Sequence, residues 1–132
     1  MIDHTGVVVS DFEASKRFYQ LALGAIGMSK LMEFSASITG HTDVAGFGPP
    51  AKPEFWISAA LDGQTPNRPP VHVAFRVETR AEVDAFYAAA IEAGGQDNGK
   101  PGLRQHYHPT YYGAFVRDPD GHNIEAVCHV PE

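Results

Sequence analysis

The chain contains the same pattern twice, and this internal repeat limits the possible folds more than any other feature of its 132 residues. Residues 4–27 align to residues 72–95 without a gap, at a constant offset of 68 positions. The repeated positions include a histidine, a Phe-Tyr pair and a glycine: His4 and His72, Phe18-Tyr19 and Phe86-Tyr87, Gly27 and Gly95. A histidine in register with an aromatic pair and a glycine predicts two copies of one structural unit.

Each copy begins with a pattern typical of a strand and continues with one typical of a helix. In the second copy, apolar residues recur at helical spacing and form one stripe: Val83, Phe86, Tyr87, Ala90 and Ile91. Ser10–Glu13 and Thr79–Glu82 have the capping-box form, which predicts that a helix begins at each. Gly27 and Gly95 stand where each helix is expected to end.

Three shorter strands are predicted after each helix, at 29–34, 43–47 and 54–61 in the first copy and at 103–107, 111–117 and 123–130 in the second. Residues 61–70 are rich in turn formers and poor in apolar residues, which is typical of a connector. We therefore expect an α+β fold of two β-α-β-β-β modules. Module one covers 1–62, the connector 63–69 and module two 70–132.

Strand alternation separates the polar residues from the predicted core. His72 and Arg76 share the strand face opposite Val73 and Phe75, and His4 occupies the matching face of the first copy. After the turn formed by residues 118–121, Glu125 points away from the core by the same alternation. Two imidazoles and one carboxylate are the ligand set of a divalent-metal site. We predict one ion, of Fe, Mn, Zn, Ni or Co, bound by His4, His72 and Glu125.

The repeat also indicates which ligand is missing. The residue 68 positions before Glu125 is Ile57, which cannot coordinate a metal. Glu54 lies an odd number of positions from Ile57, so alternation places it on the other face. Three protein ligands leave coordination positions free for water or substrate, as in catalytic sites.

Residues 105–112, "QHYHPTYY", place two histidines and three tyrosines just before a predicted strand. We predict that His108 and Tyr112 transfer protons and that Tyr107 and Tyr111 contact the substrate. The alternative is an aromatic edge over the core with its histidines in solvent.

Other polar and aromatic residues are also candidates for the site. Arg76 could bind a substrate carboxylate or pair with an acid across the sheet. Trp56 and Ile57 could form the wall of a pocket, although an aromatic core or a dimer contact would also explain Trp56. His122 and His129 are predicted at the surface, and Cys128 in the core.

Composition narrows the class of partner. A formal charge of −6 argues against nucleic acid, which requires a basic face, and favours a neutral or cationic small molecule. The single cysteine excludes an internal disulfide and fits a cytoplasmic location. We find no apolar run long enough to span a membrane and no signal-peptide pattern.

These motifs together resemble the vicinal oxygen chelate superfamily, which includes glyoxalase I, extradiol dioxygenases and metal-free bleomycin-binding proteins. The similar segments are "DHTGVVVSDFEASKRFY", "VHVAFRV" and "AFVRDPDGHNIEAV". The resemblance implies that His4, His72 and Glu125 hold a metal. It also implies that the modules pair into a partly closed, cup-shaped mixed sheet with the helices outside, and that the protein is a homodimer.

The expected function is a metal-dependent enzyme that acts on a small oxygen-rich substrate chelated to the metal, as an isomerase, lyase or dioxygenase. Glyoxalase I enzymes resemble the chain but have a fourth ligand where Ile57 stands here. Extradiol dioxygenases are similar too, with a tyrosine where this chain has Phe115. The alternative is a metal-free, drug-sequestering protein of the bleomycin-resistance type.

Overall fold

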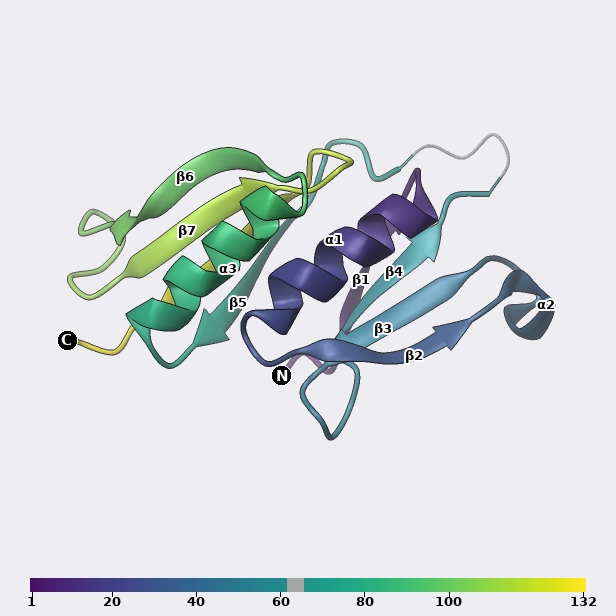
Figure 1. The fold of residues 1–132 in the computed structure, drawn as a ribbon, viewed down its shortest axis with the longest axis horizontal. Helices are drawn as coiled ribbons and strands as arrows, with labels where there is room; N and C mark the ends of the chain where they lie inside the picture. Colours follow the sequence, from purple (N-terminus) through teal and green to yellow (C-terminus); the bar gives the residue numbers. More distant parts are fainter. Residues whose placement is uncertain (62–65) are drawn as a thin grey trace.

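The computed structural model describes residues 1–61 and 66–132, and part of the predicted connector, residues 63–65, lies outside these ranges. The chain forms two modules of the predicted kind (Figure 1). Module one contains β1 (Thr5–Val9), α1 (Phe12–Gly24), β2 (Ser29–Phe34), α2 (Ala36–Thr39), β3 (Val44–Gly48) and β4 (Phe55–Ala59). Module two contains β5 (His72–Val77), α3 (Arg80–Glu92), β6 (Gln96–Leu103), β7 (Tyr112–Arg117) and β8 (Asn123–Cys128).

Each module has its own four-stranded mixed sheet, and the two sheets have the same topology. The strand orders are β1-β4-β3-β2 and β5-β8-β7-β6. The first and last strands of each module pair in parallel, and the remaining neighbours pair antiparallel. The predicted α+β class and the two-module architecture are confirmed. Within the described residues, hydrogen bonds between strands join only strands of the same module, so the two sheets do not close on each other.

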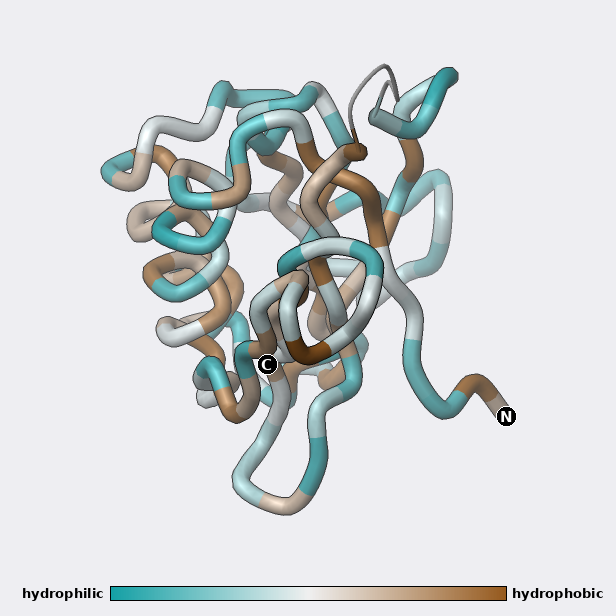
Figure 2. Tube along the Cα trace, turned by 90° about the vertical axis from the view of Figure 1, so that its right-hand side faces the viewer, coloured by the Kyte–Doolittle hydropathy of each residue, from teal (hydrophilic) through white to brown (hydrophobic). Residues whose placement is uncertain are grey.

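Both long helices cover the same side of the molecule. Figure 2 shows α1 and α3 on one side of the strands, with the N-terminal segment projecting from the other side. The two helices pack against each other, and their buried residues belong to one cluster with residues of both sheets. Phe55 of β4 and Phe75 of β5 continue this core across the module boundary, with ring centroids 5.5 Å apart. No helix in the described part of the chain is long and apolar enough to cross a bilayer.

The two helices begin differently, although both starts have the same sequence pattern. At α3 the predicted capping box is confirmed: Thr79 accepts from the backbone N–H of Glu82, whose carboxylate accepts from the N–H of Thr79. At α1 the prediction is wrong, because Asp11 is the N-cap and accepts from Ala14. The backbone N–H of Ser10 donates instead to Asp120 of module two.

The strand prediction fails at one place in module two. β6 covers Gln96–Leu103, whereas the strand predicted at 103–107 is a turn in which the N–H of Tyr107 donates to the carbonyl of Arg104. β6 is an edge strand of four polar residues, two glycines, a proline and a final leucine, so it lacks the apolar alternation by which a strand is recognised. The short helix α2 was not predicted either.

Candidate functional site

The parallel pairing of β5 with β8 brings two of the predicted metal ligands together. The register sets His72 opposite Asn123 and Ala74 opposite Glu125, so His72 and Glu125 lie on the sheet face that α3 does not cover. The Nε2 atom of His72 is 3.1 Å from Oε2 of Glu125. The carboxylate is buried, with 1% of Glu125 exposed, whereas the His72 side chain is half exposed.

The orientation of His72 suits a metal ligand. Its Nδ1 atom is 3.0 Å from the carbonyl oxygen of Asn123, which can only accept a hydrogen bond, so Nδ1 carries the hydrogen. In the neutral ring, Nε2 then has its lone pair directed toward Glu125. A metal-ligating histidine usually donates its other N–H to a carbonyl or carboxylate in this way. Two ligands about 2.1 Å from one ion at a right angle lie about 3.0 Å apart, close to the observed separation.

Tyr111 holds the other carboxylate oxygen. Its hydroxyl donates to Oε1 of Glu125. Burial, reinforced by this hydrogen bond to the carboxylate, raises the pKa of Tyr111 well above its ordinary value of 10.0. A Cβ at Gly113 would lie 3.3 Å from Oε1 and 3.1 Å from the Tyr111 ring, so the glycine leaves room for this contact.

His4, the third predicted ligand, lies in module one on the same cleft. It precedes β1, is exposed, and its Nδ1 is 2.7 Å from Oδ1 of Asp3. The cleft has a volume of about 430 Å³ and is lined by both modules: Ile2, Asp3, His4, Thr5, Glu54, His72, Val73, Ala74 and Phe75. In the described residues, the ligand atoms of His4, His72 and Glu125 do not all lie within 4.8 Å of one another. The structure thus joins His72 to Glu125 and leaves His4 apart.

The strand register corrects the position assigned to the missing fourth ligand. Gly6 of β1 pairs with Trp56, as Ala74 of β5 pairs with Glu125. Trp56 is therefore the counterpart of Glu125, and the constant offset of 68 does not extend to β4. Ile57 faces α1 and is fully buried in the core, so it has no surface for a substrate. Tryptophan cannot coordinate a metal either, so this position still supplies no fourth ligand.

The same correction identifies a residue that sequence reasoning missed. Glu54 lies two positions before Trp56, on the open side of the sheet, and lines the cleft beside His4 and His72. Its carbonyl accepts from the N–H of Thr5, which aligns the start of β1. The sequence pattern indicates Glu54 only when Trp56, and not Ile57, is taken as the counterpart of Glu125. The indole of Trp56 lies over Gly46, where a Cβ would be 2.8 Å from the ring.

The tyrosines of residues 105–112 point to different sides of the sheet. Tyr107 is exposed and contacts the ring of Tyr111, 5.1 Å away. Tyr112 points toward the helix, where its hydroxyl donates to Asp84 of α3 at 2.8 Å, so it does not reach Glu125. His108 is exposed, and its Nδ1 is 3.1 Å from the hydroxyl of Thr110.

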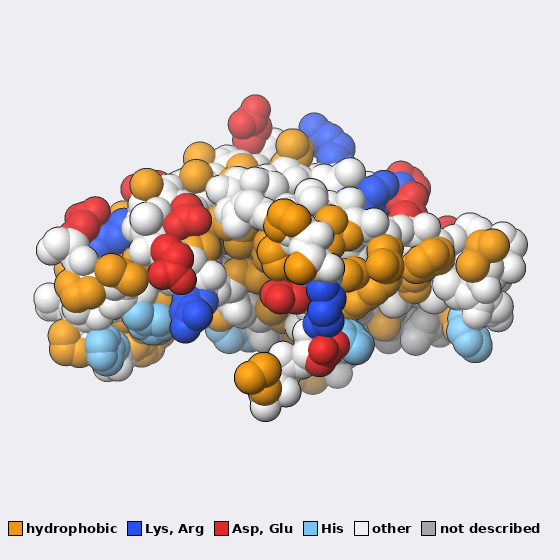
Figure 3. Space-filling model, turned by 90° about the horizontal axis from the view of Figure 1, so that it is seen from below, with side chains coloured by type: hydrophobic (Ala, Val, Ile, Leu, Met, Phe, Trp, Pro, Cys, Tyr) orange, Lys and Arg blue, Asp and Glu red, His pale blue; other side chains and the backbone are white. Residues whose placement is uncertain are grey.

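Arg76 lies farther along β5 and lines a second cleft of about 390 Å³. Glu54, Ala74 and Phe75 line both this cleft and the larger one. Histidine side chains are visible along the side of the molecule from which the N-terminal segment projects (Figure 3).

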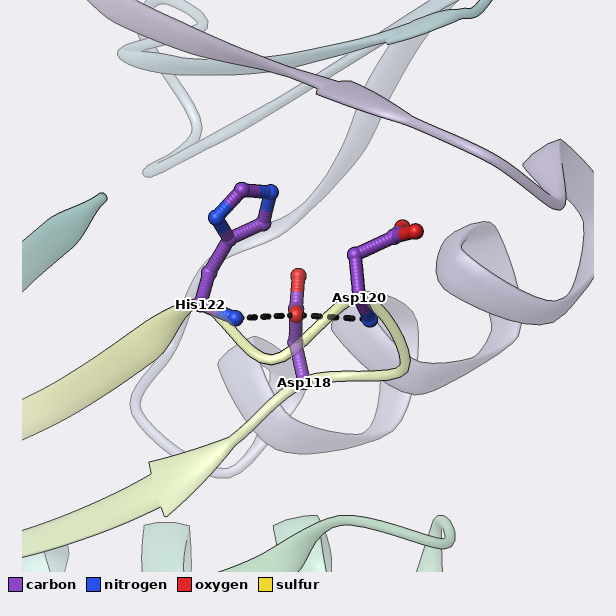
Figure 4. A group of neighbouring side chains, drawn as sticks. All are labelled: Asp118, Asp120 and His122. Carbon is purple, nitrogen blue, oxygen red and sulfur yellow. Dashed lines mark hydrogen bonds between the residues drawn. The ribbon is translucent and has the colours of Figure 1, made fainter. Parts of the chain in front are cut away.

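A second group of side chains could hold a metal ion by distance alone. Ligand atoms of Asp118, Asp120 and His122 lie within 4.8 Å of one another in the turn before β8 (Figure 4). Asp118 already accepts from the hydroxyl of Tyr19 at 2.6 Å and from the backbone N–H groups of Asp120 and His122 at 2.9 and 2.8 Å.

The burial and hydrogen bonding of His122 indicate that this group has a structural role and does not bind a metal. The residue is fully buried, so the prediction of a surface position is wrong. Its Nδ1 accepts from the N–H of Val71 at 3.1 Å, so in the neutral ring Nε2 carries the hydrogen and has no lone pair for a metal. Cys128 is buried and His129 exposed, as predicted.

Comparisons with known proteins agree with this architecture. A profile of the Glyoxalase/Bleomycin resistance protein/Dioxygenase superfamily matches residues 1–126. A glyoxalase/bleomycin resistance protein from Albidiferax ferrireducens T118 is 30% identical over 98% of both chains, with a TM-score of 0.76.

More distant structures show the same fold. A glyoxalase/bleomycin resistance protein/dioxygenase family enzyme from Burkholderia phytofirmans PsJN is 22% identical over 98% of both chains, with a TM-score of 0.68. A Zea mays glyoxalase I mutant is 19% identical, with a TM-score of 0.66 over 96% of this chain and 44% of its own. No curated protein matches the chain. With its duplicated modules and a family match over almost its whole length, the chain belongs to the glyoxalase/bleomycin resistance protein/dioxygenase superfamily.

Proposed function

We propose that the protein is a metal-dependent enzyme that acts on a small, oxygen-rich substrate. His72 and Glu125 would hold a divalent ion, with His4 as the third ligand. The observation that supports this most is the 3.1 Å separation of His72 Nε2 from Glu125 Oε2. The other ring nitrogen of His72, Nδ1, donates to the carbonyl of Asn123. A buried carboxylate requires a positive partner, and this geometry presents a nitrogen lone pair and a carboxylate oxygen to one point.

A divalent ion bound there supplies Lewis acidity toward the vicinal oxygens of a substrate. Tyr111 holds a proton at its hydroxyl against Glu125 and fixes the orientation of the carboxylate. The cleft admits a small molecule beside His72, with Phe75 and Val73 as its apolar lining. An isomerase, lyase or dioxygenase reaction is consistent with this set of groups. His108 is the proposed proton carrier outside the cleft.

The third ligand requires a movement or a partner. His4 belongs to an exposed N-terminal segment, so a shift of this segment could bring its imidazole to the His72–Glu125 pair. A homodimer, in which modules of two chains share the site, is the proposed assembly.

The 3.1 Å separation of His72 Nε2 from Glu125 Oε2 is also a hydrogen-bond distance, and this observation favours a second function. If His72 is protonated, its Nε2–H donates to Glu125, and the buried carboxylate is satisfied without a metal. The protein would then be a metal-free binder of small molecules, of the bleomycin-resistance type.

Metal analysis separates these functions. Protein purified without added metal or chelator is expected to contain about one equivalent of Fe, Mn, Zn, Ni or Co per chain. His72→Ala and Glu125→Gln should lose this metal, and His4→Ala should weaken cobalt(II) binding in a titration. Asp120→Asn, in the other cluster, should retain it.

Two results would contradict the metal-dependent function. One is wild-type protein that is metal-free and does not respond to cobalt(II). The other is metal that survives in Glu125→Gln but is lost in Asp120→Asn. Circular dichroism of each variant checks that it is folded.

A further inference from the structure

A smaller hollow lies beside the His72–Glu125 pair on the open face of module two. It has a volume of about 240 Å³ and is lined by Asn98, Gly99, Arg104, Tyr107, Phe115 and Asn123. Register ties it to the site: Phe115 of β7 pairs with Glu125 on one side and with Gly99 of β6 on the other. The His72 ring stacks near Phe115, with centroids 6.3 Å apart and an interplanar angle of 27°.

Arg104 provides the positive charge of this hollow. Its Cζ atom lies 5.5 Å from the centroid of Phe115. In the strand order β5-β8-β7-β6, Phe115 stands between His72 on β5 and Arg104, which directly follows β6. The guanidinium and the predicted metal ligands therefore lie on one continuous surface, separated by one aromatic ring.

The backbone of β6 holds the guanidinium in place. Nη2 of Arg104 donates to the carbonyl of Lys100 at 2.6 Å. A Cβ at Gly99 would lie 3.3 Å from Nη2, and a Cβ at Gly102 would lie 3.1 Å from Nη1. The guanidinium of Arg104 thus lies close to Gly99 and Gly102, whose lack of a side chain leaves room for it. A guanidinium that is already ordered loses less entropy when it binds a ligand.

This guanidinium has no acidic partner within the part of the chain that the structure describes. No carboxylate there lies within 4.0 Å of Arg104. Most of its donors remain available, since among the described residues only Nη2 of this side chain has a hydrogen bond to the protein. An ordered, half-buried cation without a counter-charge beside a candidate active site is suited to an anionic group of a ligand.

We infer that Arg104 determines specificity by binding a carboxylate of the substrate, whose vicinal oxygens face His72 and Glu125. This inference rests on the proposed function and adds the substrate class, an oxygen chelator that carries a carboxylate. A carboxylate fits better than a phosphate, because Arg104 is the only cation lining the hollow among the described residues. The net charge of −6 does not oppose this, since salt screens distant charges.

Arg76 is the competing candidate, since the sequence suggests it for the same task. It lies in a different cleft that also contains the carboxylate of Glu54. An anionic ligand there would meet the negative charge of Glu54, whereas among the described residues no carboxylate lies within 4.0 Å of Arg104.

The test compares two probes that differ by one carboxylate, catechol and 3,4-dihydroxybenzoate, by calorimetry with cobalt(II)-loaded protein. We expect the dihydroxybenzoate to bind about tenfold more tightly than catechol. Arg104→Gln should remove this difference without changing the affinity for catechol, and Arg104→Lys should keep part of it. Arg76→Gln, the matched control, should keep all of it.

The inference is overturned if the wild-type protein shows no preference for the dihydroxybenzoate, if Arg104→Gln retains this preference or if Arg76→Gln abolishes it. It is also overturned if inorganic phosphate displaces the dihydroxybenzoate better than acetate does, because the subsite would then be a phosphate site.

A second measurement separates this inference from the proposed function. In chelator-treated protein, benzoate should shift the Nε–H resonance of Arg104 in a ¹⁵N spectrum and leave that of Arg76 unchanged. If this shift occurs in a protein that binds no metal, the enzyme proposal fails and the carboxylate subsite stands. If the protein binds metal but shows neither the shift nor the preference, the carboxylate subsite fails and the enzyme proposal stands.

Discussion

At the scale of single residues, the main feature is how the buried carboxylate of Glu125 is satisfied. Oε1 accepts from Tyr111, and Oε2 faces His72. Both partners lie on the open side of the sheet, which keeps the polar pair out of the apolar core beneath α3. Burying the Glu125 carboxylate is energetically tolerable only while both Tyr111 and His72 remain as its partners.

Replacing Tyr111 with phenylalanine should therefore destabilise the fold by about 1–3 kcal/mol, because a buried carboxylate oxygen loses its donor. Urea unfolding followed by circular dichroism measures the change. The matched control is Tyr107→Phe, since Tyr107 is 61% exposed and should cost little. Equal effects in the two variants would contradict the assigned role of Tyr111.

Asp118 is a second buried acid, and its titration has a definite sign. Burial raises the pKa of its carboxyl above the ordinary value of 3.8, although the hydrogen bond from Tyr19 acts in the other direction. Protonation thus favours the folded state. The stability that Asp118 contributes is fully present below pH 3.8 and is lost as pH rises through its folded-state pKa.

Carboxyl ¹³C spectra recorded against pH should show Asp118 titrating above 3.8. Glu33 serves as the internal reference, since the ammonium groups of Lys16 and Lys30 lower its pKa below 4.5. An Asp118 midpoint at or below 3.8 would show that the hydrogen bonds to Asp118 outweigh its burial.

At the scale of elements, the free backbone N–H groups at the starts of α1 and α3 are capped by different residues. Thr79 and Glu82 cap α3 reciprocally, whereas Asp11 caps α1 and the backbone of Ser10 is used by Asp120. The start of α1 is thereby tied to the turn before β8, which links an element of module one to module two.

Thr79→Ala should cost about 1 kcal/mol, because it leaves an amide at the start of α3 without its acceptor. Ser10→Ala should change the stability by a few tenths of a kcal/mol at most, because only the backbone of Ser10 is used here. Urea midpoints of the two variants test this. A large loss in Ser10→Ala would mean that the sequence pattern, and not the observed cap, describes α1.

At the scale of the whole molecule, the two modules share one core. Residues buried at the α1–α3 contact and on both sheets form a single cluster. Tyr19 reaches Asp118, and Phe55 reaches Phe75. Gly95 allows close approach, since a Cβ there would lie 2.4 Å from Val116 and 2.8 Å from Phe18. The two modules therefore bury their apolar side chains in one shared core and not in two separate cores.

We accordingly expect the chain to unfold in one cooperative step. The single tryptophan, Trp56, reports on module one, whereas far-UV circular dichroism reports on both modules. The two signals should give the same urea midpoint. A tryptophan transition that clearly precedes or follows the circular dichroism transition would indicate separate folding of the modules.

The sequence by itself determined the two modules and the faces of His72 and Glu125. Both follow from short-range regularities, namely a repeat, helical spacing and the alternation of strand side chains, which do not depend on distant contacts. The second capping box could be predicted for the same reason, because all its atoms lie within four consecutive residues.

Only the tertiary structure decided which residues meet across strands. It made Trp56, not Ile57, the counterpart of Glu125, because one residue of shift in pairing reverses the face of every side chain. It buried His122 against Val71, turned Tyr111 and not Tyr112 toward Glu125, and set Arg104 over Phe115. Each of these depends on register and on segments far apart in the chain, which local sequence patterns do not specify.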